Sequence, residues 1–223
     1  MDILLTGAGG QLGAEITRKA SEFNLEITAL AREDLDVSVQ EAVMRTVSSV
    51  RPKIIVNTAA YTAVDNAETD RQAAFAINRD GPANLAEAAE KAGAILLHIS
   101  TDYVFNGSKP SPYVETDETS PLNVYGESKL AGEIAVRRTC ARHVILRTSW
   151  LYGLHGGNFV KTMLRLAQER DARIGPARAG DDEAADLAGA KQAIEDVALV
   201  VILGDGGHHQ IPVVTGKLDG DPV

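Results

Sequence analysis

The chain has 223 residues, of which 44% are hydrophobic, so it is long enough for one large domain, or one domain with a small appendage, around a buried core. Its net charge of -9 argues against DNA or RNA as a partner, because phosphate backbones are bound through Lys and Arg, although one small anion needs only a local positive site. The single cysteine, Cys140, excludes an intramolecular disulfide and fits a reducing compartment. No signal peptide is visible and the longest aliphatic run, residues 197–203, is too short to span a bilayer, so we expect a cytoplasmic protein without a membrane partner.

Short apolar runs alternate with longer helical patterns, which is typical of a parallel sheet covered by helices. The expected strands are residues 3–6, 25–30, 53–57, 94–100 and 143–147. Their continuous apolar character suits strands that are buried on both faces. We therefore predict an α/β fold, a Rossmann-like doubly wound parallel sheet with helices on both faces.

Two helical stretches carry specific signals. Ser38 followed by Glu41 is a capping-box pattern, which predicts a helix over residues 39–50 with one face of valines. Residues 73–91 are rich in alanine and helical in pattern, but they are interrupted at Gly81-Pro82. Proline can begin a helix and breaks one in mid-course, so we expect a boundary there.

The second half of the chain is less regular. Between residues 105 and 123 lies a loop rich in Pro, Ser and Gly, long enough to suggest a functional segment. After about residue 170 the periodicity weakens. Further helices are expected at residues 124–138, 158–170 and 184–197, and further strands at residues 197–203 and 211–215.

The first strand runs directly into a glycine-rich turn, Gly7-Ala8-Gly9-Gly10-Gln11-Leu12-Gly13, and then into a helix. Gly7, Gly10 and Gly13 can serve a tight turn, close approach of the backbone to a pyrophosphate, and close packing of helix on strand. The helix N-terminus adds unpaired N–H groups for the phosphates. Turns between strand and helix use glycine in any case, but this position in an α/β chain favours dinucleotide binding over a structural turn.

The end of the second strand bears on the choice of cofactor. An acidic residue there would bind the ribose 2′-hydroxyl of NAD, but this chain has Ala31-Arg32. Arg32 can pair with the 2′-phosphate of NADP, or it can be an ordinary surface residue; the balance mildly favours NADPH over NADH. Asp36 and Val37 would then lie near the adenine. The segment after the third strand, Ala59-Ala60-Tyr61-Thr62, would lie near the ribose and pyrophosphate.

Tyr125 and Lys129 lie four residues apart at the start of an expected helix, and hence on one face. A tyrosine hydroxyl titrates near pH ~10, so it needs help to exchange a proton at neutral pH. A Lys ammonium one turn away stabilises the phenolate and can reach the ribose hydroxyls of a cofactor. Thr101, after the fourth strand, supplies a hydroxyl for a reacting carbonyl oxygen. In a reduction, hydride leaves the nicotinamide while Tyr125 gives its proton to that oxygen.

Each of these signals has an ordinary explanation. Tyr and Lys four apart occur by chance on many helices, and Thr-Asp after a strand is often only a helix cap. The ordered set is different, because the glycine turn, Thr101, Tyr125 and Lys129 occur in the sequence of elements that a reductase needs. Adjacent His208 and His209 have no spaced Cys or His beside them, so we expect no metal site.

The same residues resemble the extended short-chain dehydrogenase/reductases. The exact sequences of the motifs resemble one family among these, the dTDP-4-dehydrorhamnose reductases. The longer blocks are specific to the family rather than to the fold. The matching stretches are residues 7–13, 56–65, 76–86, 98–105, 120–133, 147–153 and 158–167. The resemblance thus covers residues 1–170 and implies reduction of the 4-keto group of dTDP-4-dehydro-L-rhamnose to give dTDP-L-rhamnose.

The resemblance also implies roles for individual residues. Thr101, Tyr125 and Lys129 form the catalytic set, and Thr101, Asp102 and Trp150 contact the sugar nucleotide. The nicotinamide cofactor, NADPH or NADH, is contacted by Gly10, Gln11, Leu12, Asp36, Val37, Ala60, Tyr61, Thr62, Tyr125 and Lys129. Some members of the family use Mg2+, where Glu15 can take part, and a homodimer is compatible with the family.

The chain departs from the family after residue 170, where it reads like a truncated or frame-shifted end. This predicts an NAD(P)-binding Rossmann domain with the catalytic residues at 1–170, and an atypical segment at 171–223 that is a remnant of a substrate domain. The alternatives are a non-catalytic NAD(P)-binding regulatory subunit of the same fold, a sugar-nucleotide epimerase or dehydratase with tightly held NAD, and a reductase inactivated by its altered C-terminus. Retention of Thr101, Tyr125 and Lys129 argues against the regulatory subunit, because binding alone needs no proton donor.

Overall fold

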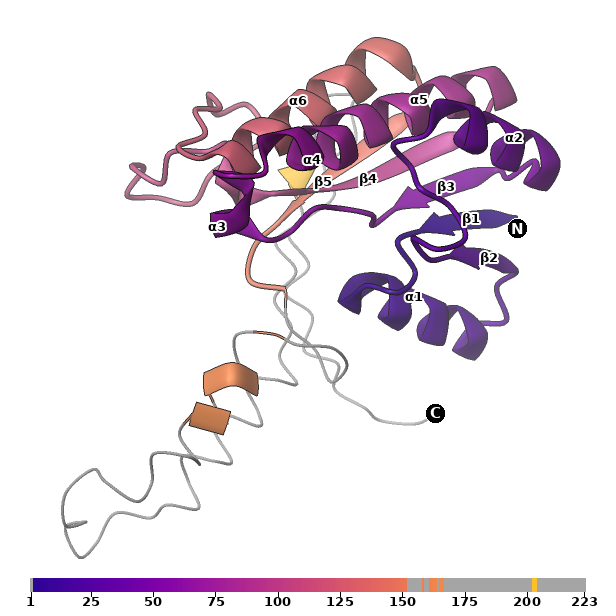
Figure 1. Ribbon diagram of the computed structural model, residues 1–223, viewed down its shortest axis with the longest axis horizontal. Coiled ribbons are helices and arrows are strands. Elements are labelled where there is room, and N and C mark those ends of the chain that lie inside the picture. Colours follow the sequence, from indigo (N-terminus) through magenta and orange to yellow (C-terminus); the bar gives the residue numbers. More distant parts are fainter. Residues whose placement is uncertain (1, 152–157, 159–160, 164, 167–201, 204–223) are drawn as a thin grey trace, which may run out of the picture.

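The computed structural model describes residues 2–151, 158, 161–163, 165–166 and 202–203. Its centre is a sheet of five parallel strands in the order β2-β1-β3-β4-β5, with a short sixth strand, β6, antiparallel to the edge strand β5 (Figure 1). The strands are β1 (Ile3–Thr6), β2 (Ile27–Leu30), β3 (Ile54–Asn57), β4 (Ile95–Thr101), β5 (His143–Thr148) and β6 (Ile202–Leu203). The chain adds β2 on one side of β1 and β3 on the other, so the direction of winding reverses between β1 and β3. In open α/β sheets that point forms the ligand crevice.

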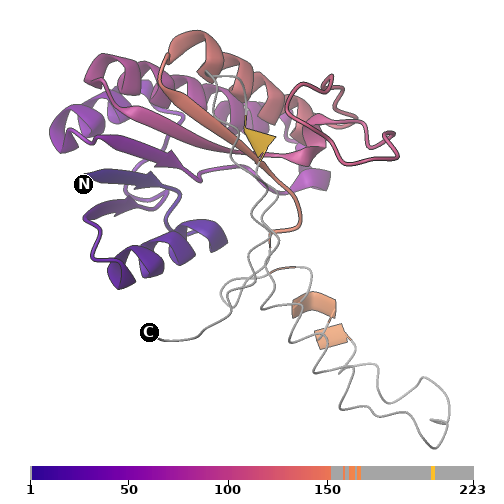
Figure 2. The same cartoon turned by 180° about the vertical axis from the view of Figure 1, so that it is seen from behind.

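Helices cover both faces of this sheet, as predicted. In Figure 1, α2, α5 and α6 lie over one face and α1 lies against the other; the view from behind in Figure 2 shows α1 beneath β1 and β2. The helical elements are α1 (Gln11–Glu22), α2 (Gln40–Val50), α3 (Val64–Ala67), α4 (Arg71–Phe75), η1 (Ala76–Asp80), α5 (Gly81–Ala92), η2 (Asp102–Val104) and α6 (Val124–Thr139). The expected doubly wound α/β architecture is therefore confirmed.

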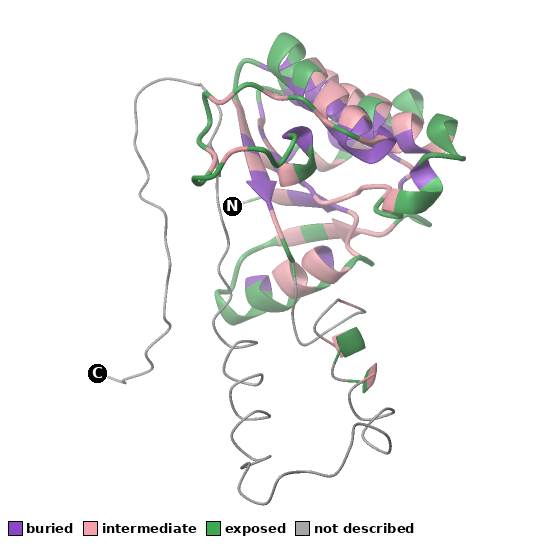
Figure 3. Ribbon diagram, turned by 90° about the vertical axis from the view of Figure 1, so that its left-hand side faces the viewer, coloured by how far each residue is buried: buried purple, intermediate pink, exposed green. Residues whose placement is uncertain are grey.

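The apolar residues of the strands explain this layering. Leu4, Ile55, Leu96 and Ile145 are fully or almost fully buried, and they point toward the layer of α2, α5 and α6 in one core cluster. Burial in Figure 3 follows the same pattern, with buried residues in the strands and on the helix faces turned toward the sheet. None of the helices in the described part of the chain is both long and apolar enough to cross a membrane.

The strand boundaries agree with the prediction to within two residues. The largest difference is at β2, which begins at Ile27 rather than at Leu25. Asn24 has a positive φ of 52°, and the Leu25 amide donates to the Ala20 carbonyl, so Leu25 still belongs to the turn that ends α1. Its side chain is 43% exposed. An apolar residue at that position therefore did not mark the start of the strand.

The predicted capping box at α2 is wrong. The residue before α2 is Val39, and no side chain caps it. Ser38 instead donates both its amide (2.9 Å) and its hydroxyl (2.6 Å) to Asp36 Oδ1. The Ser38 hydroxyl, which a capping box requires, is bonded to Asp36 instead of to the helix. Such local turns compete with helix capping for the same polar groups.

The boundary expected at Gly81-Pro82 takes an unexpected form. The chain remains helical from α4 through η1 into α5, but η1 is a π-helical turn directly before the proline. Pro82 has no N–H to continue the hydrogen-bond pattern, and it occupies the first turn of α5, where none is needed. The Asn78 carbonyl of η1 lies so close to α6 that any Cβ at Gly132 would collide with it. The π turn and Gly132 together bring α6 close to the layer of α5.

The loop predicted between residues 105 and 123 contains no regular helix or strand. Several predictions fall wholly or largely outside the described residues: the helices at 158–170 and 184–197, the strand at 211–215, and the domain division at residue 170. Within these segments, residues 161–163 and 165–166 are helical. Of the strand expected at 197–203, the last two residues form β6.

Candidate active site

The glycine turn between β1 and α1 is built so that only glycine fits at two positions. Gly7 has a φ of +77°, and a Cβ there would lie 2.5 Å from the Ala59 amide nitrogen. A Cβ on Gly13 would collide with the Gly7 carbonyl oxygen, so α1 packs directly on the turn. Gly10 precedes α1 and no side chain caps it, which leaves the first N–H groups of the helix free to receive a phosphate. The turn therefore fits the pyrophosphate of a dinucleotide.

A cavity of about 300 Å³ lies beside this turn, where β1, β2 and β3 end. It is bordered by polar and apolar groups from all three strand ends. The residues that line it are Gly7, Gly9, Gly10, Arg32, Glu33, Leu35, Asp36, Val37, Thr58, Ala59, Ala60 and Ile77. The cavity thus occupies the crevice between β1 and β3, and it is lined by the three residues that were expected near the adenosine end, Arg32, Asp36 and Val37.

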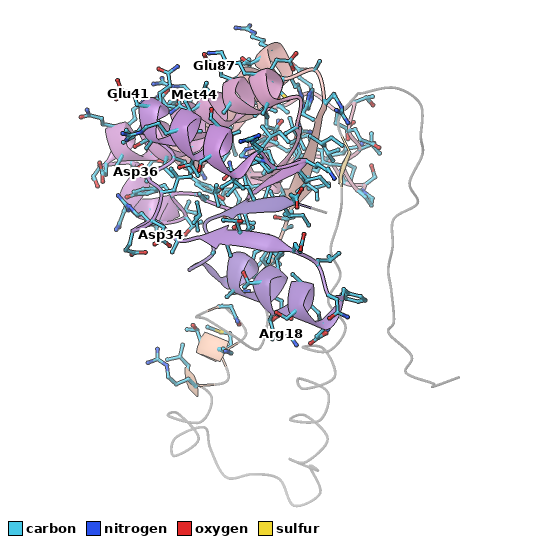
Figure 4. All side chains as sticks on the ribbon, turned by 90° about the vertical axis from the view of Figure 1, so that its right-hand side faces the viewer. Arg18, Asp34, Asp36, Glu41, Met44 and Glu87 are labelled. Carbon is cyan, nitrogen blue, oxygen red and sulfur yellow. The ribbon has the colours of Figure 1, made fainter. Side chains whose placement is uncertain are left out.

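Asp36 is a half-buried carboxylate that remains charged. Its bonds from the Ser38 hydroxyl and amide lower its pKa, and the nearby Arg32 guanidinium adds to this effect. Asp34, two residues earlier, accepts the Ala31 amide at 3.0 Å and so shapes the turn after β2. Asp34 and Asp36 project at the same edge of the molecule, away from α1 (Figure 4). Asp34 therefore holds the backbone beside Arg32, and Asp36 holds the backbone at Ser38.

A second cavity, of about 590 Å³, opens on the other side of the glycine turn. Gly9, Gly10, Thr58 and Ala60 line both cavities, so the two adjoin at the turn. The remaining residues that line the second cavity are Gln11, Leu12, Gly13, Thr62, Val64, Ile99, Ser100, Thr101, Asp102, Tyr103, Tyr125, Thr148, Trp150 and Leu151. Arg32 and Tyr125 therefore line two neighbouring cavities that meet at the glycine turn.

Tyr125 and Thr101 meet in this second cavity. Both side chains are largely buried, and both line this cavity. Burial raises the pKa of Tyr125, the neighbouring Thr101 hydroxyl lowers it in part, and Asp102 and Tyr103 raise it further. The phenol is therefore protonated at neutral pH, as a proton donor must be. The Thr101 hydroxyl donates to Asp102 Oδ1 at 3.1 Å, so it must turn away from Asp102 to donate to another oxygen.

Lys129 lies one turn after Tyr125, as expected, but its ammonium group has another partner. Lys129 Nζ donates to the Ile99 carbonyl at 2.6 Å, and the residue is 2% exposed. Burial lowers its pKa to about 8, although Glu133 opposes that shift. Lys129 lines neither cavity. Its predicted contacts with the phenolate and with a cofactor ribose stay predictions.

Tyr61 is the other predicted cofactor residue that lines neither cavity. Its ring packs against Val124 and Tyr125 in a small apolar cluster. Its backbone amide donates to Asn78 Oδ1 at 2.9 Å, and Asn78 Nδ2 donates to the Tyr61 carbonyl and to Ser128 Oγ, both at 3.0 Å. Asn78 thereby fastens the loop after β3 to α6, which holds Ala60 and Thr62 at the cavity wall.

A buried polar network lies beneath the glycine turn. Asn57 Oδ1 accepts the Thr6 hydroxyl (2.8 Å) and the Ala59 amide (3.0 Å), and Asn57 Nδ2 donates to His98 Nδ1 (3.0 Å). This arrangement leaves the proton of the neutral imidazole on Nε2, which has no hydrogen-bond partner within the described residues. The position of His98 within a buried strand predicts a core histidine with both nitrogens bonded, but only Nδ1 has a partner within the described residues. The network joins the ends of β1, β3 and β4.

Acid should weaken the fold through His98. Burial, and to a lesser degree the charge of Lys129, lowers the folded-state pKa of His98 well below its ordinary value. The unfolded chain therefore binds a proton first, and stability present above pH ~6.5 is lost as the pH falls, by about 1.4 kcal/mol per pH unit. Urea unfolding at pH 7.0 and 5.5 measures this slope. His98→Gln should show a smaller loss of unfolding free energy than the parent chain over that interval; an equal loss would contradict the assignment.

Among the described residues, no three His, Cys, Asp or Glu side chains come together as a metal site would require. Glu15, which the family resemblance connected with Mg2+, lies on the exposed face of α1 and pairs with Arg18. Arg18 projects from α1 at the far side of the molecule from Asp36 (Figure 4). Cys140 is buried, as expected for a structural thiol, and burial raises its pKa.

The chain was compared with known proteins. Residues 1–174 match the family model of the RmlD substrate binding domain. The dTDP-4-dehydrorhamnose reductase of Escherichia coli is 51% identical over 174 residues, which are 77% of this chain and 58% of that protein. The enzyme of the same name from Sinorhizobium fredii is 44% identical over 202 residues, or 91% of this chain and 65% of that protein. The chain therefore spans less than two thirds of the length of these relatives.

Solved structures of proteins with the same name superpose on this chain. The dTDP-4-dehydrorhamnose reductase of Clostridium acetobutylicum superposes with a TM-score of 0.74 at 44% identity, covering 76% of this chain and 60% of that one. The Bacillus anthracis enzyme of that name, solved in complex with NADP, gives the same values. The Bordetella bronchiseptica enzyme WbmG, in complex with NAD and UDP, gives a TM-score of 0.66 at 25% identity, covering 75% of this chain and 59% of that one.

Proposed function

The chain belongs to the RmlD substrate binding domain family, and from that premise we propose that it reduces the 4-keto group of dTDP-4-dehydro-L-rhamnose to give dTDP-L-rhamnose, with NADPH or NADH as the reductant. The observation that carries this proposal is the larger cavity, which is lined by the glycine turn and by Tyr125 and Thr101 together. A binding protein of the same fold needs the turn alone. A reductase needs the turn and a protonated acid in one crevice.

The residues present fit a nicotinamide dinucleotide. Glycine is required at Gly7, where a side chain would strike the backbone of Thr58 and Ala59, and at Gly13, where it would strike the backbone of the turn. The uncapped N-terminus of α1 suits a pyrophosphate. When bound, the reduced nicotinamide supplies a hydride to the carbonyl carbon of the substrate. Tyr125 donates its phenolic proton to the carbonyl oxygen, and Thr101 holds that oxygen by a hydrogen bond.

The protein's own electrostatics favour this division of roles. The pKa of Tyr125 is raised, so the phenol carries the proton before the reaction. Proton transfer leaves a buried phenolate, whose charge the Thr101 hydroxyl and the Lys129 ammonium one turn away can stabilise. Asp102 Oδ2 accepts a hydrogen bond from the Ser149 hydroxyl at 2.7 Å. The same carboxylate would accept hydrogen bonds from hydroxyl groups of the sugar.

Trp150 is proposed as the platform for the sugar nucleotide. Its ring is 72% exposed and lines the second cavity, and its backbone has a positive φ of 53°. A tryptophan in that left-handed conformation is strained, which is common at residues retained for a site. The exposed indole offers an apolar face to a sugar or base and a polar N–H at its edge.

Arg32 should favour NADPH over NADH. It is exposed at the end of the crevice where the adenosine would lie, and its guanidinium can pair with a 2′-phosphate. Arg32→Ala should weaken NADPH binding about 10-fold and leave NADH binding nearly unchanged, since a charged hydrogen-bonded pair contributes about 1.5–3 kcal/mol and exposure reduces it. Cofactor fluorescence titrations measure both constants. Arg45→Ala, on α2 outside both cavities, is the control; equal loss for the two cofactors in Arg32→Ala would contradict the role.

The position of Lys129, which lines neither cavity, favours one alternative: a protein that binds the cofactor without turning over the sugar. Mixing the purified 223-residue chain with NADPH and dTDP-4-dehydro-L-rhamnose separates the two. Loss of NADPH absorbance that depends on the sugar supports the reductase. Cofactor binding without that loss supports the alternative.

A further inference from the structure

Glu133 is a fully buried carboxylate on α6 that lies outside both cavities. It follows Lys129 by one helical turn and Tyr125 by two, so the three residues share a face of the helix. Its carboxylate accepts a hydrogen bond from the Ser100 hydroxyl at 2.6 Å. It also forms a buried bidentate ion pair with Arg147, through Nε at 2.9 Å and Nη2 at 2.7 Å. Arg137 Nη2 adds a fourth bond at 3.1 Å from the surface side.

These bonds join α6 and β4, which carry the catalytic residues, to β5. Ser100 directly precedes Thr101 at the end of β4, and its carbonyl accepts the Thr148 hydroxyl of β5 at 3.1 Å. Arg147 directly precedes Thr148, and its guanidinium lies 4.9 Å from the ring centroid of Phe105, where the long loop begins. Glu133 therefore ties α6 to the ends of β4 and β5 at the wall of the larger cavity.

Glu133 is also the negative charge that opposes the effect of burial on Lys129. The other buried ionisable groups on the strands packed against this part of α6 are His98 on β4 and Arg147 on β5, and half-buried Asp102 begins η2. On α6 itself the other ionisable groups within two turns of Lys129 are Tyr125, Glu127 and Arg137. The charged residues of α3, α4, η1 and α5 are at the surface or only half buried. They are Asp65, Arg71, Arg79, Asp80, Glu87, Glu90 and Lys91.

We propose that Glu133 is a positioning residue of the reductase: with Arg147 it fixes α6 to β4 and β5, so that Tyr125 and Thr101 face the same carbonyl oxygen, and it sets a negative charge beside buried Lys129. This inference rests on the proposed function, because it assigns Glu133 a part in that reaction. A purely structural ion pair behaves differently. Replacing both members of a buried pair with uncharged residues of similar volume is often neutral for stability. If the pair had only a structural role, such a double variant would therefore behave like the parent chain.

The test compares Glu133→Gln, the double variant Glu133→Gln/Arg147→Met and the surface control Arg137→Gln, each in the full chain. Lysine labelled with 13C at Cε reports the titration of Lys129, whose signal is assigned with Lys129→Arg. In Glu133→Gln the titration midpoint of Lys129 should fall by about one pH unit, because its counter-charge is lost. The alkaline limb of the kcat profile should move with it, so kcat at pH 8 falls about five-fold while the KM for NADPH changes less than two-fold.

The double variant separates positioning from folding. It should regain the thermal midpoint of the parent chain, yet its Lys129 midpoint and its kcat profile should stay displaced toward lower pH. Arg137→Gln should leave both unchanged. A parental Lys129 midpoint in both Glu133 variants, or recovery of the kcat profile together with stability in the double variant, would overturn the inference. If the parent chain consumes no NADPH, the proposed function fails, and the Lys129 titration still decides whether Glu133 acts on that group.

Discussion

Tyr125→Phe should reduce sugar-dependent NADPH oxidation by about 10²–10⁴-fold, the range expected when a positioned acid is lost. The substitution removes one hydroxyl and keeps the ring that packs edge-on to Tyr103, with ring centroids 5.5 Å apart. Because the pKa of Tyr125 is raised by burial and by Asp102, the phenol holds its proton throughout the neutral range. The loss should therefore be nearly constant from pH 6 to pH 8. Stopped-flow or steady-state absorbance of NADPH measures it.

The matched control for that variant is Tyr103→Phe. Tyr103 lines the same cavity and contacts the same ring, but it is 44% exposed and lies one residue beyond Asp102. We expect Tyr103→Phe to lower kcat less than five-fold, and both variants to bind NADPH within two-fold of the parent chain, because the phenol hydroxyl contributes to proton transfer rather than to the pyrophosphate site. Equal activity of Tyr125→Phe and the parent chain would remove Tyr125 from the mechanism.

Gly13→Val should abolish NADPH binding, with a loss of at least about 100-fold in affinity, and should lower the free energy of unfolding by about 1–3 kcal/mol, as overpacked sites do. A Cβ on Gly13 would collide with the Gly7 carbonyl, a backbone atom that cannot rotate away. α1 must then shift from the turn, and its N-terminal N–H groups no longer point at a common phosphate position. Isothermal titration with NADPH and urea unfolding give the two quantities.

Gly9→Ala is the control for the glycine turn. A Cβ at Gly9 would meet the Ala31 Cβ at 3.6 Å, which is ordinary van der Waals contact. We expect its unfolding free energy to stay within about 0.5 kcal/mol of the parent value, as for substitutions without a steric conflict, and NADPH binding to fall much less than in Gly13→Val. Binding lost to the same degree in both variants would mean that any added side chain blocks the crevice, and that the packing of α1 on the turn is not what matters.

The sequence was sufficient for those parts of the fold that depend on local pattern. Strand positions followed from short apolar runs, and the site at the carboxyl ends of β1, β3 and β4 followed from parallel topology with the glycine turn after β1. Residues at fixed positions relative to these elements, such as Thr101 and Tyr125, were therefore expected at one crevice, and the structure brings them together. Lys129 and Tyr61, which were expected to contact the cofactor, line neither cavity.

The rest depends on pairs that are far apart in the chain. Thr6 with Asn57, Asn57 with His98, and Asn78 with Ser128 are separated by 51, 41 and 50 residues. Nothing in a single sequence reports which buried polar groups will satisfy one another, because each bond depends on the final packing. The predicted capping box was wrong for a related reason. The Ser38 hydroxyl bonds to the nearby Asp36 carboxylate, and the sequence did not show which of the two partners it would choose.

Glu133 shows the same limit in the active site. In the sequence it is one acidic residue on a helix that also carries Lys129 and Arg137, a spacing typical of surface ion pairs. Its partner Arg147 is on a different element, and the bond to Ser100 reaches a third. Arg147 and Thr148 end β5, and their sequence gives no sign that the arginine is 3% exposed. Only the three-dimensional arrangement relates this carboxylate to the catalytic residues.

A crystal structure of the chain with NADP+ tests the central claim most directly. We predict electron density for the pyrophosphate against Gly10 and the first turn of α1, the adenosine phosphate beside Arg32, and the nicotinamide ring in the larger cavity next to Tyr125. Density that places the nicotinamide away from Tyr125, or a dinucleotide bound elsewhere on the molecule, would contradict a reductase built around that phenol.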